Sequence, residues 1–316
     1  MSIHNRTQDI RMARERNMYI YPYLVSVDDM FAETVNKLMS DTLIRMQDLP
    51  IEKRTWPINP QTSEFAQLVD IQRNGSLFFL GFSRLNMNDG PAKGTLTGKL
   101  VPFDLKEDEG FAHLAAALYD ASTGAFVAEN VRGSLSAERM IQYIDTYIQR
   151  ESEPAPKLRP VIQEDIMAKI ATGQGEYRRL ELGLCPQYFS QADLENNASL
   201  GDVLSNQGMR NFPGTLYISF QARRNDTLSS SIKSIVHSIC GIFQARSYGA
   251  HAIKKCKIVK NEENTGSGEL LDLLNARVFK KARVKVEDKR SVSYEPRYRE
   301  LRAAYNEWKY KYFTFN

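Results

Sequence analysis

The sequence predicts an α+β protein of two domains, each a mostly antiparallel sheet with packed helices. Three observations support this fold class. The chain has 316 residues, which is long for a single domain. Its 42% hydrophobic and 25% charged residues are close to the averages of folded soluble proteins. Segments with strand periodicity and segments with helical periodicity occur in both halves of the chain.

A helix and a buried strand are predicted first. Apolar residues at helical spacing predict an amphipathic helix over 27–49, which Pro50 ends. Its apolar face fits either the core or a dimer surface, and we favour the core. The aromatic run 76–82 is short and follows the turn signal Asn74-Gly75, which favours a buried strand over a helix.

A hairpin and a second helix follow. The apolar segments 114–119 and 125–129 are separated by five turn-forming residues that end in Gly124, which is typical of a hairpin. Ser136 is a candidate N-cap for a helix whose apolar face extends to Ile148. The first half therefore combines an antiparallel sheet with helices.

The second half has the same mixture in another order. We expect a strand at 215–220, a helix at 228–243, and further strands at 252–259 and 276–286. The last of these strands alternates basic and apolar residues, so that one face is basic. A final helix, with aromatic residues along one side, is expected over 295–312.

A proline-rich segment separates the two halves. Residues 151–160 contain three prolines and mixed charge, which favours an extended linker. We therefore expect an acidic N-terminal domain at 1–152, a linker at 153–160 and a basic C-terminal domain at 161–316.

Charge is distributed unevenly between the halves. Residues 1–156 hold 16 Lys and Arg against 21 Asp and Glu, whereas residues 157–316 hold 26 against 17. Net charges of −5 and +9 concentrate positive potential on the second half. Such a potential attracts phosphate backbones, anionic membranes or acidic proteins, although many charged segments only solvate a surface.

The cations of the second half cluster on two predicted strands and the loop after them. If these strands pair, the cations share one surface that would bind duplex DNA through phosphates, without reading bases. The candidate nucleic-acid-binding residues are Lys254, Lys255, Lys257, Lys260, Lys280, Lys281, Arg283, Lys285, Lys289 and Arg290.

Two alternatives stay open. Asp272, Glu287 and Lys289 could form a metal-dependent nuclease site, because such enzymes combine separated carboxylates with a lysine near the attacking water. The basic face could instead dock an acidic protein. Mg²⁺-dependent cleavage of DNA would support the nuclease. Purification of the protein without bound nucleic acid would support the docking of an acidic protein.

Several classes of site lack their motifs in this sequence. The four histidines are scattered, and no nucleophile elbow, phosphate loop or dinucleotide fingerprint is present, so we expect no metal, no cofactor and no enzymatic activity. Three widely spaced cysteines do not suggest disulfides or zinc. No apolar stretch is long enough to span a membrane, and we expect a cytoplasmic protein.

Four segments resemble an uncharacterised bacterial family, a domain of unknown function associated with phage defence. They are residues 77–88, 107–110 and 130–134 with the following helix, and the tail from 268 to 295. The resemblance covers about two thirds of the chain. More distantly, the sequence is similar to the RexA exclusion protein of phage lambda and to the KwaB component of the Kiwa defence system. These relatives imply a dimeric DNA-binding protein that senses or inhibits phage and works with a membrane-protein partner.

Overall fold

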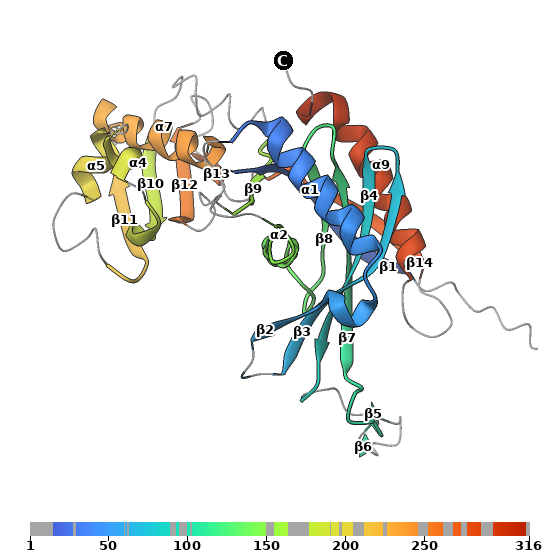
Figure 1. The fold of residues 1–316 in the computed structure, drawn as a ribbon. Coiled ribbons are helices and arrows are strands. Elements are labelled where there is room, and N and C mark those ends of the chain that lie inside the picture. The colour runs from blue at the N-terminus through green and yellow to red at the C-terminus, as the bar shows by residue number, and fades with distance from the viewer. Residues whose placement is uncertain are drawn as a thin grey trace, which may run out of the picture.

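The protein has an α+β fold, as the sequence predicts. The computed structural model describes residues 15–27, 30–59, 61, 63–88, 93–94, 100–101, 103–149, 155–163, 177–189, 191–195, 198–204, 212–223, 226–245, 252–261, 268–272, 277–285 and 293–313. Figure 1 shows a large sheet flanked by helices and a smaller sheet beside it.

An eight-stranded antiparallel sheet is the larger of the two. Its strands are β1 (Glu15–Ser26), β2 (Thr55–Asn59), β3 (Glu64–Asn74), β4 (Leu77–Asn86), β7 (Phe111–Asp120), β8 (Ala125–Asn130), β9 (Lys157–Pro160) and β14 (Lys280–Lys285). Seven of them follow the order β14-β1-β8-β7-β4-β3-β2, and β9 pairs with the later part of β1. The short strands β5 (Lys93–Gly94) and β6 (Leu100–Val101) pair separately.

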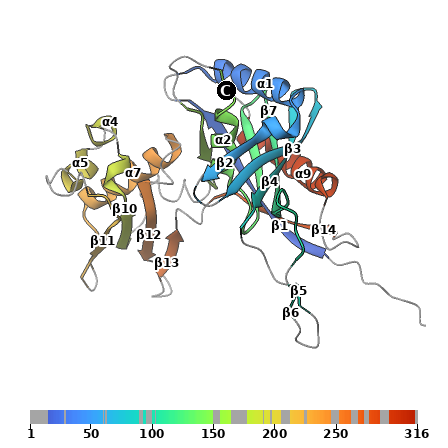
Figure 2. The ribbon, with the colours of Figure 1, turned by 60° about the horizontal axis from the view of Figure 1, so that its bottom comes forward.

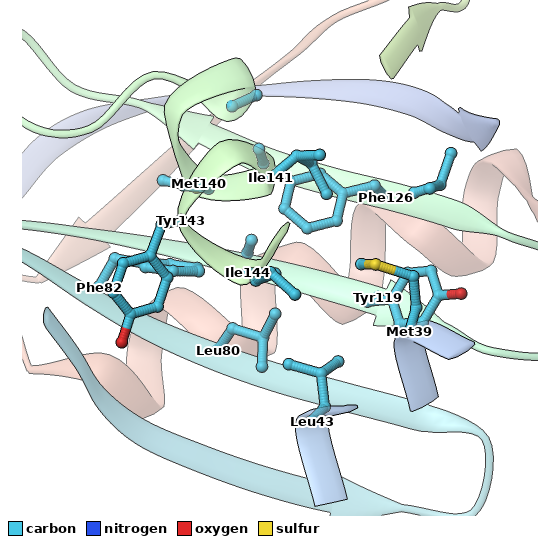
Figure 3. Packing of buried hydrophobic residues seen from close by; sticks show 14 of the residues in the cluster. Met39, Leu43, Leu80, Phe82, Tyr119, Phe126, Met140, Ile141, Tyr143 and Ile144 are labelled. Atoms are coloured by element: carbon cyan, nitrogen blue, oxygen red, sulfur yellow. The ribbon is translucent and has the colours of Figure 1, made fainter. Parts of the chain in front are cut away.

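Helices cover both faces of this sheet (Figures 1 and 2). Helices α1 (Ala32–Gln47) and α2 (Ala137–Asp145) contribute to one apolar core, and α9 (Tyr294–Tyr312) contributes to the other. Figure 3 shows the first core, where Met39 and Leu43 of α1 and Tyr143 of α2 lie over Leu80 and Phe82 of β4. Strand β4 is buried on both sides, which explains its uninterrupted apolar run.

The smaller sheet has four antiparallel strands. They are β10 (Tyr177–Leu184), β11 (Leu216–Gln221), β12 (Ile253–Asn261) and β13 (Gly268–Asp272), in the order β11-β10-β12-β13. Its apolar face packs with α5 (Ala198–Leu204) and α7 (Ser230–Ala245), and α4 (Gln191–Glu195) lies beside α5. Two short 3₁₀ helices, Ile51–Arg54 and Pro186–Tyr188, complete the described elements. None of the described helices combines the length and the apolar composition that a membrane span requires.

Locally encoded elements agree with the sequence predictions. The hairpin of β7 and β8 is present, and Gly124 adopts a φ of 71°, which the turn requires. Ser136 caps α2 by accepting a hydrogen bond from the backbone N–H of Arg139 at 3.3 Å. The first helix begins at Ala32 instead of residue 27, because β1 continues to Ser26. Its apolar side chains lie in the core.

The chain returns to the large sheet at its C-terminal end. Strand β14 pairs with β1, and α9 packs on the large sheet, although both belong to the range 161–316 for which the sequence predicts a separate basic domain. The later part of the predicted linker is not free either, because Lys157–Pro160 forms β9. The backbone N–H of Val278 donates to the carbonyl of Val161 at 2.9 Å, so the chain leaves for the smaller sheet and comes back at neighbouring points.

Candidate nucleic-acid interface

The predicted cations lie on two different sheets. The condition that the two basic strands pair is not met, because β12 pairs with β10 and β13, whereas β14 pairs with β1. The cause lies in the apolar sides of the strands. Ala282 and Val284 of β14 are buried with Met18 and Ile20 of β1 beneath α9, while Cys256 and Ile258 of β12 are buried in the core of the smaller sheet.

Strand β14 presents three cations on its outward side. It stands at one end of the strand order, and the side chains of Lys281, Arg283 and Lys285 are exposed, whereas the residues between them are buried. Alternation along a strand directs these three side chains to one face, away from α9. Three of the ten predicted residues therefore form one exposed row.

Strand β1 adds aromatic and polar residues to the same face. Tyr19 stands opposite Lys281 in the antiparallel register, Asn17 opposite Arg283, and Glu15 opposite Lys285. The Lys281 Nζ lies 5.9 Å from the centre of the Tyr19 ring, and 39% of Tyr19 is exposed. We define the β1–β14 face as Glu15, Asn17, Tyr19, Phe279, Lys281, Arg283 and Lys285.

Phe279 extends this face at its inner end. Its ring stacks on Tyr21, with centroids 5.9 Å apart and an angle of 28° between the planes, and 50% of Phe279 is exposed. The only ion pair within the face joins the Nη1 of Arg283 to the Oε2 of Glu15 at 3.8 Å, among the residues that the structure describes. Both partners are exposed, so solvent screens the pair and leaves Arg283 accessible.

Lys280 does not belong to this face. Its Nζ forms an ion pair with the Oε2 of Glu307 on α9 at 2.7 Å. The alternation of the strand turns Lys280 toward the helix and away from Lys281. Lys280 therefore links β14 to α9.

The cations of β12 meet carboxylates on their own sheet. The Nζ of Lys255 lies 2.6 Å from the Oε2 of Glu181, and Arg179 also pairs with Glu181. The hydrogen bond from Lys255 lowers the pKa of Glu181, which keeps this carboxylate charged. Lys257 stands between Glu181 and Asp272 in the strand register. Lys254 is exposed, and the backbone of Lys260 lies in β12.

Of the three nuclease candidates, only Asp272 lies within the described residues. Asp272 ends β13 in the smaller sheet, while the strand before Glu287 and Lys289 lies in the larger sheet. Glu287, Lys289 and Arg290 lie outside the described residues. Within the described ranges, no three His, Cys, Asp or Glu side chains are grouped as metal ligands.

Sequence reasoning missed the β1 half of the face. Asn17 and Tyr19 alternate with Met18 and Ile20, which is the period-two pattern of a strand with one buried side. This alternation predicts that Asn17 and Tyr19 lie on the exposed side of a strand. Nothing in the local sequence predicts that this strand pairs with β14.

The chain matches a protein-family model over most of its length. The model of a family of unknown function (DUF6731) matches residues 39–312. No curated protein matches the chain. The matched range begins within α1, includes every described strand from β2 to β14 and helix α9, and excludes β1.

Proposed function

Because the chain belongs to this family of unknown function, we propose its function from its own surface: sequence-nonspecific, non-enzymatic binding of duplex DNA through the β1–β14 face. The observation that carries the proposal is the row of Lys281, Arg283 and Lys285, exposed at every second residue of an outer strand. Cations that neutralise phosphates release counterions, which gives affinity without base recognition.

The spacing of the row suits a phosphate backbone. Residues two apart on one strand face lie about 6.8 Å apart, so the row spans about 14 Å. One strand of duplex DNA advances about 3.4 Å along the helix axis per phosphate, so the row is long enough for each of its three cations to meet a different phosphate. Contacts of this kind position the protein on DNA but carry no sequence information.

The composition of the face also favours nucleic acid over an acidic protein. Its three cations face one carboxylate, Glu15, and the remaining members, Asn17, Tyr19 and Phe279, are polar or aromatic. Tyrosine and asparagine side chains donate hydrogen bonds to phosphate oxygens. The exposed rings add contact area with sugars or unpaired bases.

The test is DNA binding at several salt concentrations with wild type and the variant K281Q/R283Q/K285Q. Each phosphate contact contributes about 0.9 to the log–log salt slope, so the variant slope should be about 2.7 smaller. The matched control is K37Q/K53Q/K106Q, which removes the same total charge from exposed residues elsewhere. The control should bind as the wild type does.

The same samples decide between binding and catalysis. DNA incubated with Mg²⁺ and run on a denaturing gel should stay intact. Fragments would replace this proposal with the nuclease, and Glu287→Ala would then abolish cleavage but retain binding. A salt-independent affinity, or equal slopes for both triple variants, would remove the β1–β14 face as the DNA site.

We propose phage defence as the setting, on the resemblance alone. A sensor or inhibitor of this kind would act as a homodimer with a membrane-protein partner. Plaque counts on cells that produce wild type or K281Q/R283Q/K285Q test the setting. Protection that survives the triple variant would separate defence from DNA binding.

A further inference from the structure

An acidic loop lies in the connection from β4 to β7, directly before β7. It holds four carboxylates and one lysine, a net charge of −3, and all of its residues are exposed. We define the acidic loop as Phe103, Asp104, Leu105, Lys106, Glu107, Asp108 and Glu109. Its charge is opposite to that of the β1–β14 face, where three cations and Glu15 give a net charge of +2.

The acidic loop has a defined conformation. The backbone N–H of Glu109 donates to the carbonyl of Lys106 at 3.0 Å, and the backbone N–H of Lys106 donates to the Oε2 of Glu109 at 3.2 Å. The ring of Phe103 packs edge-on against Phe111, the first residue of β7, with ring centres 5.2 Å apart. A partner therefore meets a preformed surface, which lowers the entropy lost on binding.

Apolar side chains stand among the carboxylates of the loop. Phe103 is 46% exposed and Leu105 is 38% exposed. The β1–β14 face likewise exposes the rings of Tyr19 and Phe279 among its cations. Apolar and aromatic anchors with charged residues around them are typical of surfaces that bind proteins.

The carboxylates of the loop are available to a partner. Among the residues that the structure describes, none of the four forms an ion pair. On the β1–β14 face, only Arg283 has a carboxylate partner within the described ranges, the exposed Glu15. Each surface therefore presents charge that the other would neutralise.

The acidic loop and the β1–β14 face lie at the same end of the large sheet. Strands β1 and β7 both run antiparallel to β8, and Ala128 of β8 stands opposite both Tyr21 and Ala117. Six residues earlier on each strand are Glu15 and Phe111, which therefore occupy one row across the sheet. An even number of residues also keeps both on the face to which Tyr21 and Ala117 belong.

The register keeps the loop apart from the cations of its own chain. Strand β7 is three places from β14 in the strand order, which corresponds to about 14 Å. This separation exceeds the screening length of about 8 Å at physiological ionic strength. Both surfaces therefore keep their charge for a partner.

We propose that a second copy of this chain docks here, with the acidic loop of each copy on the β1–β14 face of the other. Because both surfaces lie at one end of one sheet face, a single two-fold axis forms both contacts at once and closes the dimer. The loop carboxylates meet the row of cations on β14, and Phe103 and Leu105 contact Phe279.

The contact is small and strongly charged. Each copy contributes fourteen residues, seven from the loop and seven from the face, against about 20–30 a side in a standard interface. We therefore expect a weak dimer that dissociates at high salt and at the low protein concentrations of DNA-binding assays. The dimer covers the cations of β14, so duplex DNA and the second copy compete for them. This competition rests on the proposed function, whereas the self-association does not.

Sedimentation velocity at about 100 μM protein tests the dimer in about 50 mM and about 500 mM salt. Wild type should be dimeric at low salt and shift to monomer at high salt. Two charge-reversal variants, E107K/D108K/E109K in the loop and K281E/R283E/K285E on the face, should each be monomeric at low salt. Each variant places like charges against one another across the two-fold axis, which should weaken association at least tenfold.

An equimolar mixture of the two variants is the sharper test. The reversed loop then meets the reversed face, and the native loop meets the native face, so the dimer should return at low salt. A folding defect in either variant would not be repaired by mixing, and circular dichroism verifies folding. The matched control D41K/D48K/E52K reverses three exposed carboxylates elsewhere and should dimerise as the wild type does.

Three results would overturn the contact: a wild type that is monomeric at low salt, a charge-reversal variant that stays dimeric, or a mixture that stays monomeric. Duplex DNA added to the wild-type dimer should release monomers bound to DNA, and DNA bound by the intact dimer would contradict the covered face. If DNA does not bind at all, the proposed function fails and the self-association stands. If a monomeric wild type binds DNA with the expected salt slope, the self-association fails and the proposed function stands.

Discussion

Asp120 is a fully buried carboxylate at the turn between β7 and β8. It accepts hydrogen bonds from the backbone N–H of Ser122 at 3.0 Å and from the hydroxyls of Ser122 at 2.7 Å and Thr123 at 2.9 Å. The hydroxyl of Tyr305 on α9 also donates to it. Burial raises the pKa of Asp120, but these hydrogen bonds outweigh burial and hold the pKa below its usual value.

The depressed pKa makes Asp120 a pH-dependent source of stability. A carboxyl whose pKa is lower in the folded state stabilises the protein above its unfolded pKa of about 3.9, and this contribution is lost as the pH falls further. Asp120→Asn should lower the free energy of unfolding at pH 7 by about 2 kcal/mol, because it removes charge-assisted hydrogen bonds. Urea titrations should show the gap to wild type narrowing below about pH 4.

Asp108→Asn is the matched control, since Asp108 is an exposed carboxylate. Its substitution should change the free energy of unfolding by less than about 0.5 kcal/mol. A gap between wild type and Asp120→Asn that stays constant with pH would contradict the assigned role of the Asp120 charge.

Arg297 illustrates what a sequence pattern cannot reveal about a single residue. It is a charged residue of a helix for which the sequence predicts one aromatic side, yet only 2% of it is exposed. It pairs with buried Glu129 of β8 and donates to the carbonyl of Leu114 at 3.3 Å. Burial raises the pKa of Glu129, although Arg297 opposes the shift. Helical spacing does not show which polar residue finds a buried partner 168 positions away.

Helix α9 approaches β4 closely at Gly81. A Cβ at this position would lie 2.8 Å from the hydroxyl oxygen of Tyr298 and 2.9 Å from a ring carbon of Tyr294. These rings are fixed, because Tyr294 donates to the carbonyl of Phe82 at 2.9 Å and Tyr298 donates to Asp70. The missing side chain therefore permits the helix to pack.

Gly81→Ala should lower the free energy of unfolding by about 1–3 kcal/mol, because the added methyl group overpacks this contact. Urea titration measures the change. Gly241→Ala in α7 is the matched control, where a Cβ would meet nothing within 4 Å. The control should be neutral or stabilising by up to about 1 kcal/mol, since alanine favours a helix. Equal urea midpoints for wild type and Gly81→Ala would show that α9 shifts enough to accommodate the added methyl group.

Elements were predictable where their signals are local. The β7–β8 hairpin, α2 and α9 have turn residues, caps and periodicity within short windows of sequence. The partners of β14 were not predictable, because Ala282 and Val284 suit any apolar core. Pairing of Glu15 with Lys285 joins the first described strand to the last one, and no local rule selects it.

On the scale of the whole molecule, the smaller sheet is an excursion of the chain from the larger one. The described residues between 177 and 272 form that sheet and its helices, while the segments before and after it meet at the pairing of Ile162 with Arg277. The net positive charge of the second half is therefore shared between two sheets. This sharing explains why three of the ten predicted cations, and not all ten, form the β1–β14 face.

Replacement of residues 164–276 by a short glycine-serine linker should leave the larger sheet folded. Its strands, α1, α2 and α9 lie outside the deleted range, and the ends to be joined are adjacent. Circular dichroism and dispersed NMR signals would report folding, and the urea m-value should decrease with the smaller buried surface. Removal of residues 277–316 is the contrasting variant, which exposes the core beneath α9 and should aggregate. An unfolded linker variant would mean that the larger sheet depends on the smaller one.

Pairing of β1 with β14 also fixes an order of events during synthesis. The ribosome makes β1 before the other described elements, and it makes the outer neighbour β14 and the covering helix α9 after them. Met18 and Ile20 therefore lack their contacts with β14 and α9 until those two elements have emerged. The excursion of the smaller sheet is completed before that moment, so it can fold first while the earliest strand waits for the latest one.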